Sequence, residues 1–279
     1  MPWTIFFADL DGTFVTSRKT ISPASWRALD AVARAGLEFV LCTGRPLSGL
    51  EPELLAHPAV RHAVYANGAG ILDARTGEVI HRKCLGRERA LKMYEPAKDR
   101  DVTFDIFADG RSYATRDHYD RLSEFLPDPN MCEGIRRSRT PVDKTVPEIL
   151  DEVDEVERVS MYWKDPADRD VLWPAAEALG HVSVVRSYAM NIEVSDADAT
   201  KGRALEWLCE HLGIPVEESV GFGDSLNDIS MIEAAGLGVA MANGDREARE
   251  AARLIAPAND DDGVAEVVMA CLEGRLDLP

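Results

Sequence analysis

The chain has 279 residues, enough for one large domain or for a core with an inserted second domain. Its 46% hydrophobic and 29% charged residues are ordinary for a soluble globular protein, and no apolar run approaches the length of a membrane span. The formal net charge of −18 disfavours nucleic acid or an anionic membrane surface as a partner, and an anionic substrate would need local cations to hold it.

The N-terminus and the cysteines indicate a cytoplasmic protein. The chain enters a strand pattern within three residues and lacks the basic region, apolar stretch and cleavage site of a signal peptide. The five cysteines are far apart and form no CxxC pair, which disfavours a zinc site or a disulfide framework. We therefore expect buried free thiols and no contact with a membrane.

The first predicted element is a buried strand over residues 3–8, which ends in two carboxylates. Asp9 and Asp11 stand two residues apart directly after this apolar run. Adjacent carboxylates repel one another unless a cation holds them, and such hard oxygen ligands suit Mg²⁺. An ordinary turn also explains an Asp-x-Asp-Gly-Thr stretch, and taken alone it is the safer interpretation.

A helix and a second strand follow. Ser22 and Pro23 are typical of a helix start, and Gly36 of its end. The mostly apolar residues 37–42 then predict a strand that runs into Thr43 and Gly44. The Thr43 hydroxyl and the Gly44 amide could face a phosphate oxygen, although Thr43 could equally cap a helix.

The pattern changes between roughly residues 84 and 194. Strand-like segments such as 102–107 and 182–185 alternate there with two helical stretches, which suggests an insertion. The charged run 151–157 contains spaced valines and predicts a solvated face.

The alternation of strands and helices returns late in the chain. Residues 204–212 predict a helix, 219–222 and 238–241 predict strands, and a last helix is expected from about Gly263. These elements complete a parallel α/β pattern, and ligands of such sheets bind beyond the carboxyl ends of the strands.

Two late segments add polar groups at helix starts. Lys201 opens a helix, where the dipole disfavours a cation unless an anion is near, although an exposed surface lysine is the usual alternative. Asp224, Asn227 and Asp228 lie at a strand-to-helix junction. Capping by Asp224 or Ser225 would explain one acidic group but not a second one four residues later, so a metal site is favoured.

These segments, in this order, resemble the haloacid dehalogenase superfamily, specifically its Cof-like branch (type IIB, with a C2-type cap). The matching motifs are 9–13, 43–45, 201–202 and 223–228, with weaker matches at 66–69 and 259–265 to which no catalytic role is assigned. The resemblance covers the whole chain. It implies an α/β fold: a Rossmann-like core with a central parallel sheet from residues 1–83 and 195–279, and an inserted α+β cap over 84–194 that selects the substrate.

The resemblance also implies a Mg²⁺-dependent phosphatase that hydrolyses a small phosphorylated metabolite, a sugar phosphate or a nucleotide-related ester, through an aspartyl-phosphate. Asp9 would be the nucleophile and Asp11 the general acid and base. The implied metal ligands are Asp9, Asp11 through its main-chain carbonyl, Asp224 and Asp228, and the implied phosphate-binding residues are Leu10, Thr43, Gly44, Lys201 and Asn227. Asp228 could contact the metal directly or through water, or orient Lys201.

Two other functions stay open at this point. A sugar phosphomutase would use the same residues but return the phosphoryl group to a sugar, and a non-catalytic sensor of phosphorylated metabolites would use the same fold without turnover. The intact motifs disfavour the sensor. Serine hydrolases and P-loop NTPases are disfavoured because the chain contains neither GxSxG nor GxxxxGK[ST]. The expected partner is a small phosphate ester, and the expected state is a monomer or homodimer.

Overall fold

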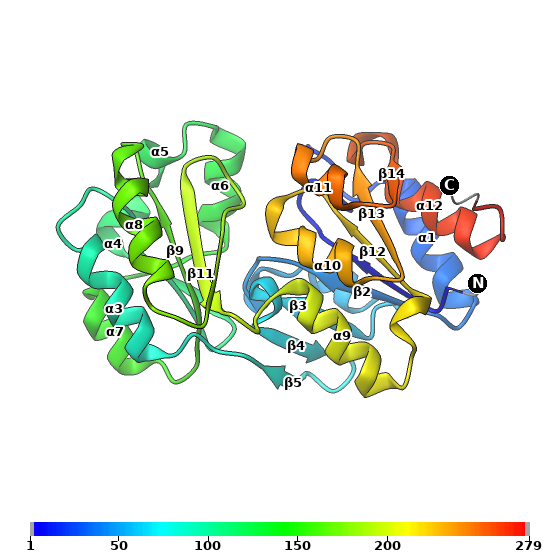
Figure 1. Ribbon diagram of the computed structural model, residues 1–279, viewed down its shortest axis with the longest axis horizontal. Helices are drawn as coiled ribbons and strands as arrows, with labels where there is room; N and C mark the ends of the chain where they lie inside the picture. The colour runs from blue at the N-terminus through cyan, green and yellow to red at the C-terminus, as the bar shows by residue number, and fades with distance from the viewer. Residues whose placement is uncertain (1–2, 277–279) are drawn as a thin grey trace. The chain divides into compact units, whose positions relative to one another are not determined.

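The computed structural model describes residues 3–276 and divides the chain into two compact units, each built around its own sheet (Figure 1). The first unit runs to Gly44, includes Glu51–His81 and resumes at Thr200. The second unit contains Arg45–Leu50 and Arg82–Ala199. The predicted combination of an α/β core and an inserted α+β part is confirmed.

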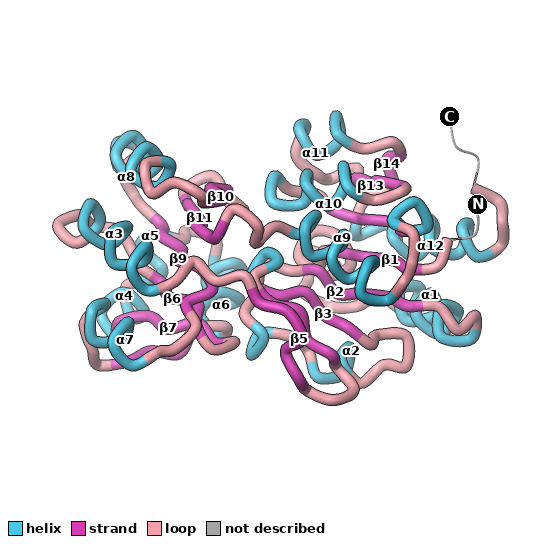
Figure 2. Tube along the Cα trace, turned by 60° about the horizontal axis from the view of Figure 1, so that its bottom comes forward, coloured by secondary structure: helices cyan, strands magenta, loops and turns pink. Residues whose placement is uncertain are grey.

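The first unit contains an eight-stranded sheet in the order β14-β13-β12-β1-β2-β3-β4-β5 (Figure 2). Its strands are β1 (Ile5–Ala8), β2 (Glu38–Cys42), β3 (His62–Tyr65), β4 (Gly70–Asp73), β5 (Glu78–Arg82), β12 (Ser219–Gly223), β13 (Leu237–Met241) and β14 (Leu254–Ala256). Pairing is parallel from β14 through β3 and antiparallel between β3 and β4. The central strands are buried along their whole length, as expected for parallel strands covered on both faces.

Helices flank this sheet. They are α1 (Pro23–Arg34), α2 (Pro52–Leu55), α9 (Lys201–Leu212), α10 (Ile229–Ala234), α11 (Arg246–Ala251) and α12 (Gly263–Leu272). Leu205 and Leu208 of α9 pack with Met231 of α10 against strand side chains such as Phe7 and Val40. This packing fixes the start of α9 beside the carboxyl ends of the central strands.

The second unit contains a six-stranded sheet in the order β10-β11-β9-β6-β7-β8. Its strands are β6 (Asp105–Ala108), β7 (Arg111–Thr115), β8 (Thr140–Val142), β9 (Val156–Tyr162), β10 (Val182–Val185) and β11 (Asn191–Asp196). Its helices are α3 (Arg87–Ala97), α4 (Arg116–Asp120), α5 (Leu122–Phe125), α6 (Pro129–Arg137), α7 (Val146–Glu152) and α8 (Ala167–Glu177). One apolar core joins the sheet to α3, α7 and α8.

Two sequence predictions for this unit were wrong. Two helical stretches were expected, but the described residues form six helices, because α4 to α7 are too short to display a helical period. The charged run 151–157 is only partly a solvated face: Glu157 lies in β9, fully buried, and accepts a hydrogen bond from the Gly110 amide at 2.9 Å.

None of the helices within residues 3–276 combines the length and the apolar character needed to cross a bilayer.

Candidate active site

The central strands bring two carboxylates together at one edge of the first sheet. Asp9 directly follows β1, and Asp224 directly follows the neighbouring parallel strand β12. The Asp9 amide extends the ladder by donating to the Phe222 carbonyl at 3.0 Å. Parallel neighbours end at the same edge of a sheet, which is why residues 215 positions apart in the chain become neighbours in space.

Lys201 bridges two carboxylates in the interior. Its Nζ lies 2.6 Å from Asp9 Oδ1 and 2.6 Å from Asp228 Oδ1, and the lysine is fully buried. Burial alone would lower the pKa of this ammonium, but Asp228 and Asp9 raise it above its ordinary value, so Lys201 is charged. The alternative of an exposed surface lysine is wrong.

Asp228 is held on both of its oxygens. While Oδ1 accepts from Lys201, Oδ2 accepts from the backbone amides of Asp224 and Ser225, each at 2.9 Å. Ser225 and Asp228 form a capping box at the 3₁₀ turn Leu226–Asp228, which precedes α10. Capping therefore does explain the second acidic residue, contrary to the prediction, and the same side chain also positions Lys201.

The donor set fits a small hard cation. One oxygen from each of Asp9, Asp224 and Asp228 lies within 4.8 Å of the others. Burial, Asp228 and Asp224 raise the pKa of Asp9 despite the opposing effect of Lys201, and burial and Asp228 raise the pKa of Asp224 to about 7. Three carboxylates thus face one ammonium, and a divalent cation would relieve the remaining repulsion.

The loop after β1 wraps closely around Asp224. The Thr13 hydroxyl donates to Asp224 Oδ1 at 2.8 Å. Gly12 has a φ of +90°, and a Cβ on this residue would lie 2.5 Å from Asp224 Oδ2. Only glycine fits here, because both the conformation and the close approach exclude a side chain.

Asp11 is not one of the three close carboxylates. Its Oδ1 accepts from Lys19 Nζ at 2.6 Å, and the Asp11 side chain is 30% exposed. Lys19 was not singled out in the sequence, and a lysine eight residues from an aspartate carries no signal of pairing. The two motif aspartates therefore occupy different environments, one buried among carboxylates and one partly exposed beside a cation.

The remaining predicted residues lie in the same unit. Thr43 is buried at the end of β2, and its amide donates to the Val64 carbonyl at 2.9 Å. Leu10 is fully buried directly after Asp9. The Asn227 amide nitrogen donates to Asn67 Oδ1 at 3.0 Å, so Asn67 belongs to this group although the sequence assigned it no role.

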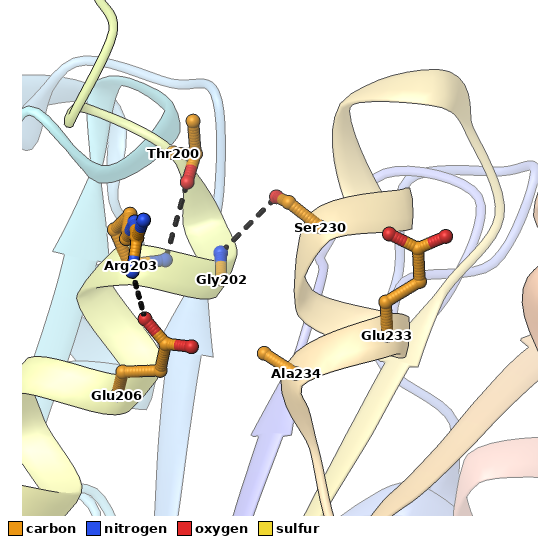
Figure 3. Close-up of a pocket in the computed structure, with 7 residues that line it drawn as sticks. All are labelled: Thr200, Gly202, Arg203, Glu206, Ser230, Glu233 and Ala234. Carbon is orange, nitrogen blue, oxygen red and sulfur yellow. Dashed lines mark hydrogen bonds and ion pairs between the residues drawn. The ribbon is translucent and has the colours of Figure 1, made fainter.

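A shallow pocket of about 290 Å³ lies beside the start of α9, and none of these carboxylates lines it (Figure 3). It is lined by Thr200, Gly202, Arg203, Glu206, Ser230, Glu233 and Ala234. The Gly202 amide donates to Ser230 Oγ at 3.1 Å, and a Cβ on Gly202 would lie 2.2 Å from the Ser230 carbonyl oxygen. The pocket thus borders a close helix–helix contact, whereas Lys201 points into the carboxylate cluster.

Known proteins are similar to this chain along most of its length. A family model described as haloacid dehalogenase-like hydrolase matches residues 6–268. The pyridoxal phosphate phosphatase YbhA of Escherichia coli is 27% identical, over 98% of this chain and 100% of the relative. The 5-amino-6-(5-phospho-D-ribitylamino)uracil phosphatase YwtE of Bacillus subtilis is 28% identical, over 96% of this chain and 97% of the relative.

A solved structure extends the likeness to three dimensions. The structure of a haloacid dehalogenase-like hydrolase from B. subtilis superposes with a TM-score of 0.82 at 27% identity, covering 95% of this chain and 99% of that chain. The likeness therefore spans both units of the chain.

Proposed function

Since the chain belongs to the haloacid dehalogenase-like hydrolases, as a phosphatase of their Cof-like branch, we propose that it hydrolyses a small phosphorylated metabolite through an aspartyl-phosphate. The observation that carries the proposal is the buried Lys201 ammonium, 2.6 Å from Asp9 and from Asp228 inside an acidic cluster. A cation fixed in this way can meet an anionic phosphoryl group that the charge of the whole chain would repel.

Asp9 is the proposed nucleophile. One carboxylate oxygen attacks phosphorus and forms the acyl-phosphate bond as the bond from phosphorus to the ester oxygen breaks. The attacking group has to be ionised, and the Lys201 ammonium favours that form, while burial and the neighbouring carboxylates oppose it.

Asp11 is the proposed general acid and base. In the first step its proton passes to the leaving ester oxygen, and in the second step it takes a proton from the water that attacks phosphorus. That attack releases inorganic phosphate and restores Asp9. The partial exposure of Asp11 gives its carboxyl group access to water, and Lys19 at 2.6 Å favours the ionised form that acts as the base in the second step.

Mg²⁺ is the proposed cofactor, which when bound neutralises negative charge on the carboxylates and on the transferring group. Asp9, Asp224 and the main-chain carbonyl of Asp11 would hold it. Both oxygens of Asp228 are already engaged by Lys201 and by backbone amides, so we assign Asp228 chiefly to holding Lys201.

The phosphoryl group would be bound by backbone and side-chain donors on four loops: Leu10, Thr43, Gly44, Lys201 and Asn227.

Residues 84–194 are the proposed cap that selects the substrate. Two relatives are named as a pyridoxal phosphate phosphatase and a 5-amino-6-(5-phospho-D-ribitylamino)uracil phosphatase, which favours cofactor-sized and sugar-containing monoesters as first candidates.

The test is phosphate release from a panel of sugar, nucleotide and cofactor phosphates, with Mg²⁺ and with EDTA, using the wild type and Asp9→Asn. We expect metal-dependent release that the variant lacks. Conversion of a hexose 1-phosphate into its isomer without phosphate release would support a phosphomutase instead, and binding of esters without turnover would support a sensor. Size-exclusion chromatography of the same samples checks the expected monomer or homodimer.

A further inference from the structure

We propose that Asn67 is a positioning residue of the phosphate site, which holds the loop after β2 and the amide of Asn227 in the arrangement that binds phosphate. The inference rests on the proposed function, because it assigns a role within the same site. Asn67 lies in the 3₁₀ turn Ala66–Gly68 between β3 and β4, and its exposed fraction is 4%.

The turn has an unusual backbone. Ala66, Asn67 and Gly68 all have positive φ, at 49°, 61° and 103°. Left-handed conformations are uncommon for residues with a Cβ, and asparagine tolerates them better than alanine. Two such residues before a glycine persist only where the contacts of the turn with its surroundings hold them.

The first contact is with the loop after β2. The backbone amide of Asn67 donates to the Thr43 carbonyl at 3.0 Å. A Cβ on Gly44 would lie 2.8 Å from Asn67 Oδ1, so the Gly44 backbone packs directly against this side chain. Asn67 therefore shapes the backbone path of Thr43 and Gly44, which follow β2 and are proposed to bind phosphate.

The second contact is with the loop after β12. The Asn227 side-chain nitrogen donates to Asn67 Oδ1 at 3.0 Å, across 160 positions of sequence. This bond sets the orientation of the Asn227 amide and uses one of its two N–H groups. The second N–H group is then available to a phosphate oxygen in a defined direction.

The third contact is with the start of α9. A Cβ on Gly68 would lie 2.3 Å from the Thr200 carbonyl oxygen, so the turn also packs against the N-cap residue that precedes Lys201. One short turn thus touches three of the loops that carry the proposed phosphate-binding residues. Asn67 is buried and acts through these neighbours, which distinguishes it from a catalytic residue.

The experiment compares Asn67→Gly with a matched control, Asp262→Gly. Asp262 has nearly the same backbone conformation (φ 62°, ψ 27°) as Asn67 (φ 61°, ψ 25°), and it makes no side-chain capping bond. Glycine keeps the positive φ at either position, so each change removes the side chain and adds similar backbone freedom. Calorimetry measures binding of inorganic phosphate in the presence of Mg²⁺, and kinetics with the best ester of the panel measure KM and kcat.

We expect Asn67→Gly to weaken phosphate binding and raise KM about tenfold, the effect of losing the hydrogen bond to Asn227, while kcat changes much less. Mg²⁺ affinity should stay within about twofold, because the contacts of Asn67 that carry the inference are with proposed phosphate-binding residues. Asp262→Gly should match the wild type. In Asn227→Ala, the further change Asn67→Gly should have a smaller effect, since the two residues act as a pair.

Unchanged phosphate affinity and KM in Asn67→Gly would overturn the inference and leave the proposed function intact. An equal loss in Asp262→Gly would also overturn it, because a general effect of flexibility would then suffice. If the wild type releases no phosphate from any ester but binds inorganic phosphate more tightly than Asn67→Gly does, the inference holds and the proposed function fails. A wild type that binds no phosphate and hydrolyses no ester would overturn both.

Discussion

The two units bury charged side chains in opposite ways. In the second unit, Arg139 lies 2.8 Å from Asp105, and Arg158 lies 2.9 Å from Glu193. Both guanidinium groups also lie over the ring of Phe107, at 4.9 and 3.6 Å from its centroid. In this cluster around Phe107 two cations face two anions, so the charge of the cluster is balanced.

In the first unit a single buried ammonium faces three carboxylates, and the pKa values of Asp9 and Asp224 are raised. Perturbed carboxyl groups at the carboxyl ends of parallel strands indicate a functional site, while balanced pairs need nothing further to be stable. The charge ratio therefore distinguishes a site that awaits a cation from an ion pair that supports the fold.

The largest expected effect is that of Asp9→Asn, which removes the ionised oxygen from the unbalanced cluster. Turnover should fall at least about 1,000-fold because an amide is a far weaker nucleophile. Initial rates of phosphate release under saturating ester and Mg²⁺ measure this. Residual activity above one per cent in protein purified twice would contradict the assignment of Asp9.

Lys201→Met and Arg139→Met form a matched pair, because each removes a buried cation from one unit. Both should lower the free energy of unfolding by about 3–5 kcal/mol, since a buried carboxylate is left unpaired. Only Lys201→Met should also lower kcat, by about 10²- to 10³-fold, because it removes a group that stabilises the transition state. Denaturant titrations and saturation kinetics measure the two effects, and a comparable loss of kcat in Arg139→Met would contradict the comparison.

The pH dependence of the metal-free protein sharpens the comparison further. The pKa of Asp224 is about 7, compared with an ordinary value of 3.8, so the folded state binds this proton more tightly than the unfolded chain does. The resulting stability is full at low pH and is lost as the pH rises through this window to about 7. The side chain introduced by Asp224→Asn cannot ionise, so the stability of this variant should not fall in that pH range.

From pH 5 to pH 8, the free energy of unfolding of the wild type should therefore fall by on the order of 2 kcal/mol relative to that of Asp224→Asn. Thermal or urea unfolding in EDTA provides the measurement. Adding Mg²⁺ should stabilise the wild type more at pH 8 than at pH 5, since the cation competes with the proton. Parallel pH curves for the two proteins in EDTA would show that Asp224 does not titrate in this range.

The smallest expected effect is the difference between Gly12→Ala and Gly77→Ala. Both glycines have positive φ, at 90° and 75°. Gly77→Ala meets no atom within 4 Å and should cost only about 1 kcal/mol for its backbone conformation. Gly12→Ala places its Cβ against Asp224 and should cost more and also weaken Mg²⁺ binding. Calorimetric titration with Mg²⁺ distinguishes them, and equal metal affinity in the two variants would remove Gly12 from the site.

Much of the first unit could be predicted because its central strands are apolar, α1, α9 and α12 are long enough to show a period, and polar residues follow the strand ends. The predicted helix start at Ser22 and Pro23 is confirmed, as is the helix that Lys201 opens. The second unit was harder because α4 to α7 are short and buried charge has no sequence period. Glu157, for example, looks like part of a solvated run until its bond with Gly110 is seen.

The sequence by itself determined the alternation of strands and helices, the family motifs and the placement of Asp9, Thr43, Lys201 and Asp224 at element ends, because local patterning and chain order suffice for these. Only the tertiary structure decided the double role of Asp228, the pairing of Asp11 with Lys19 and the contact of Asn67 with Asn227. These depend on which loops the sheet order brings together, and a single sequence does not record such long-range contacts.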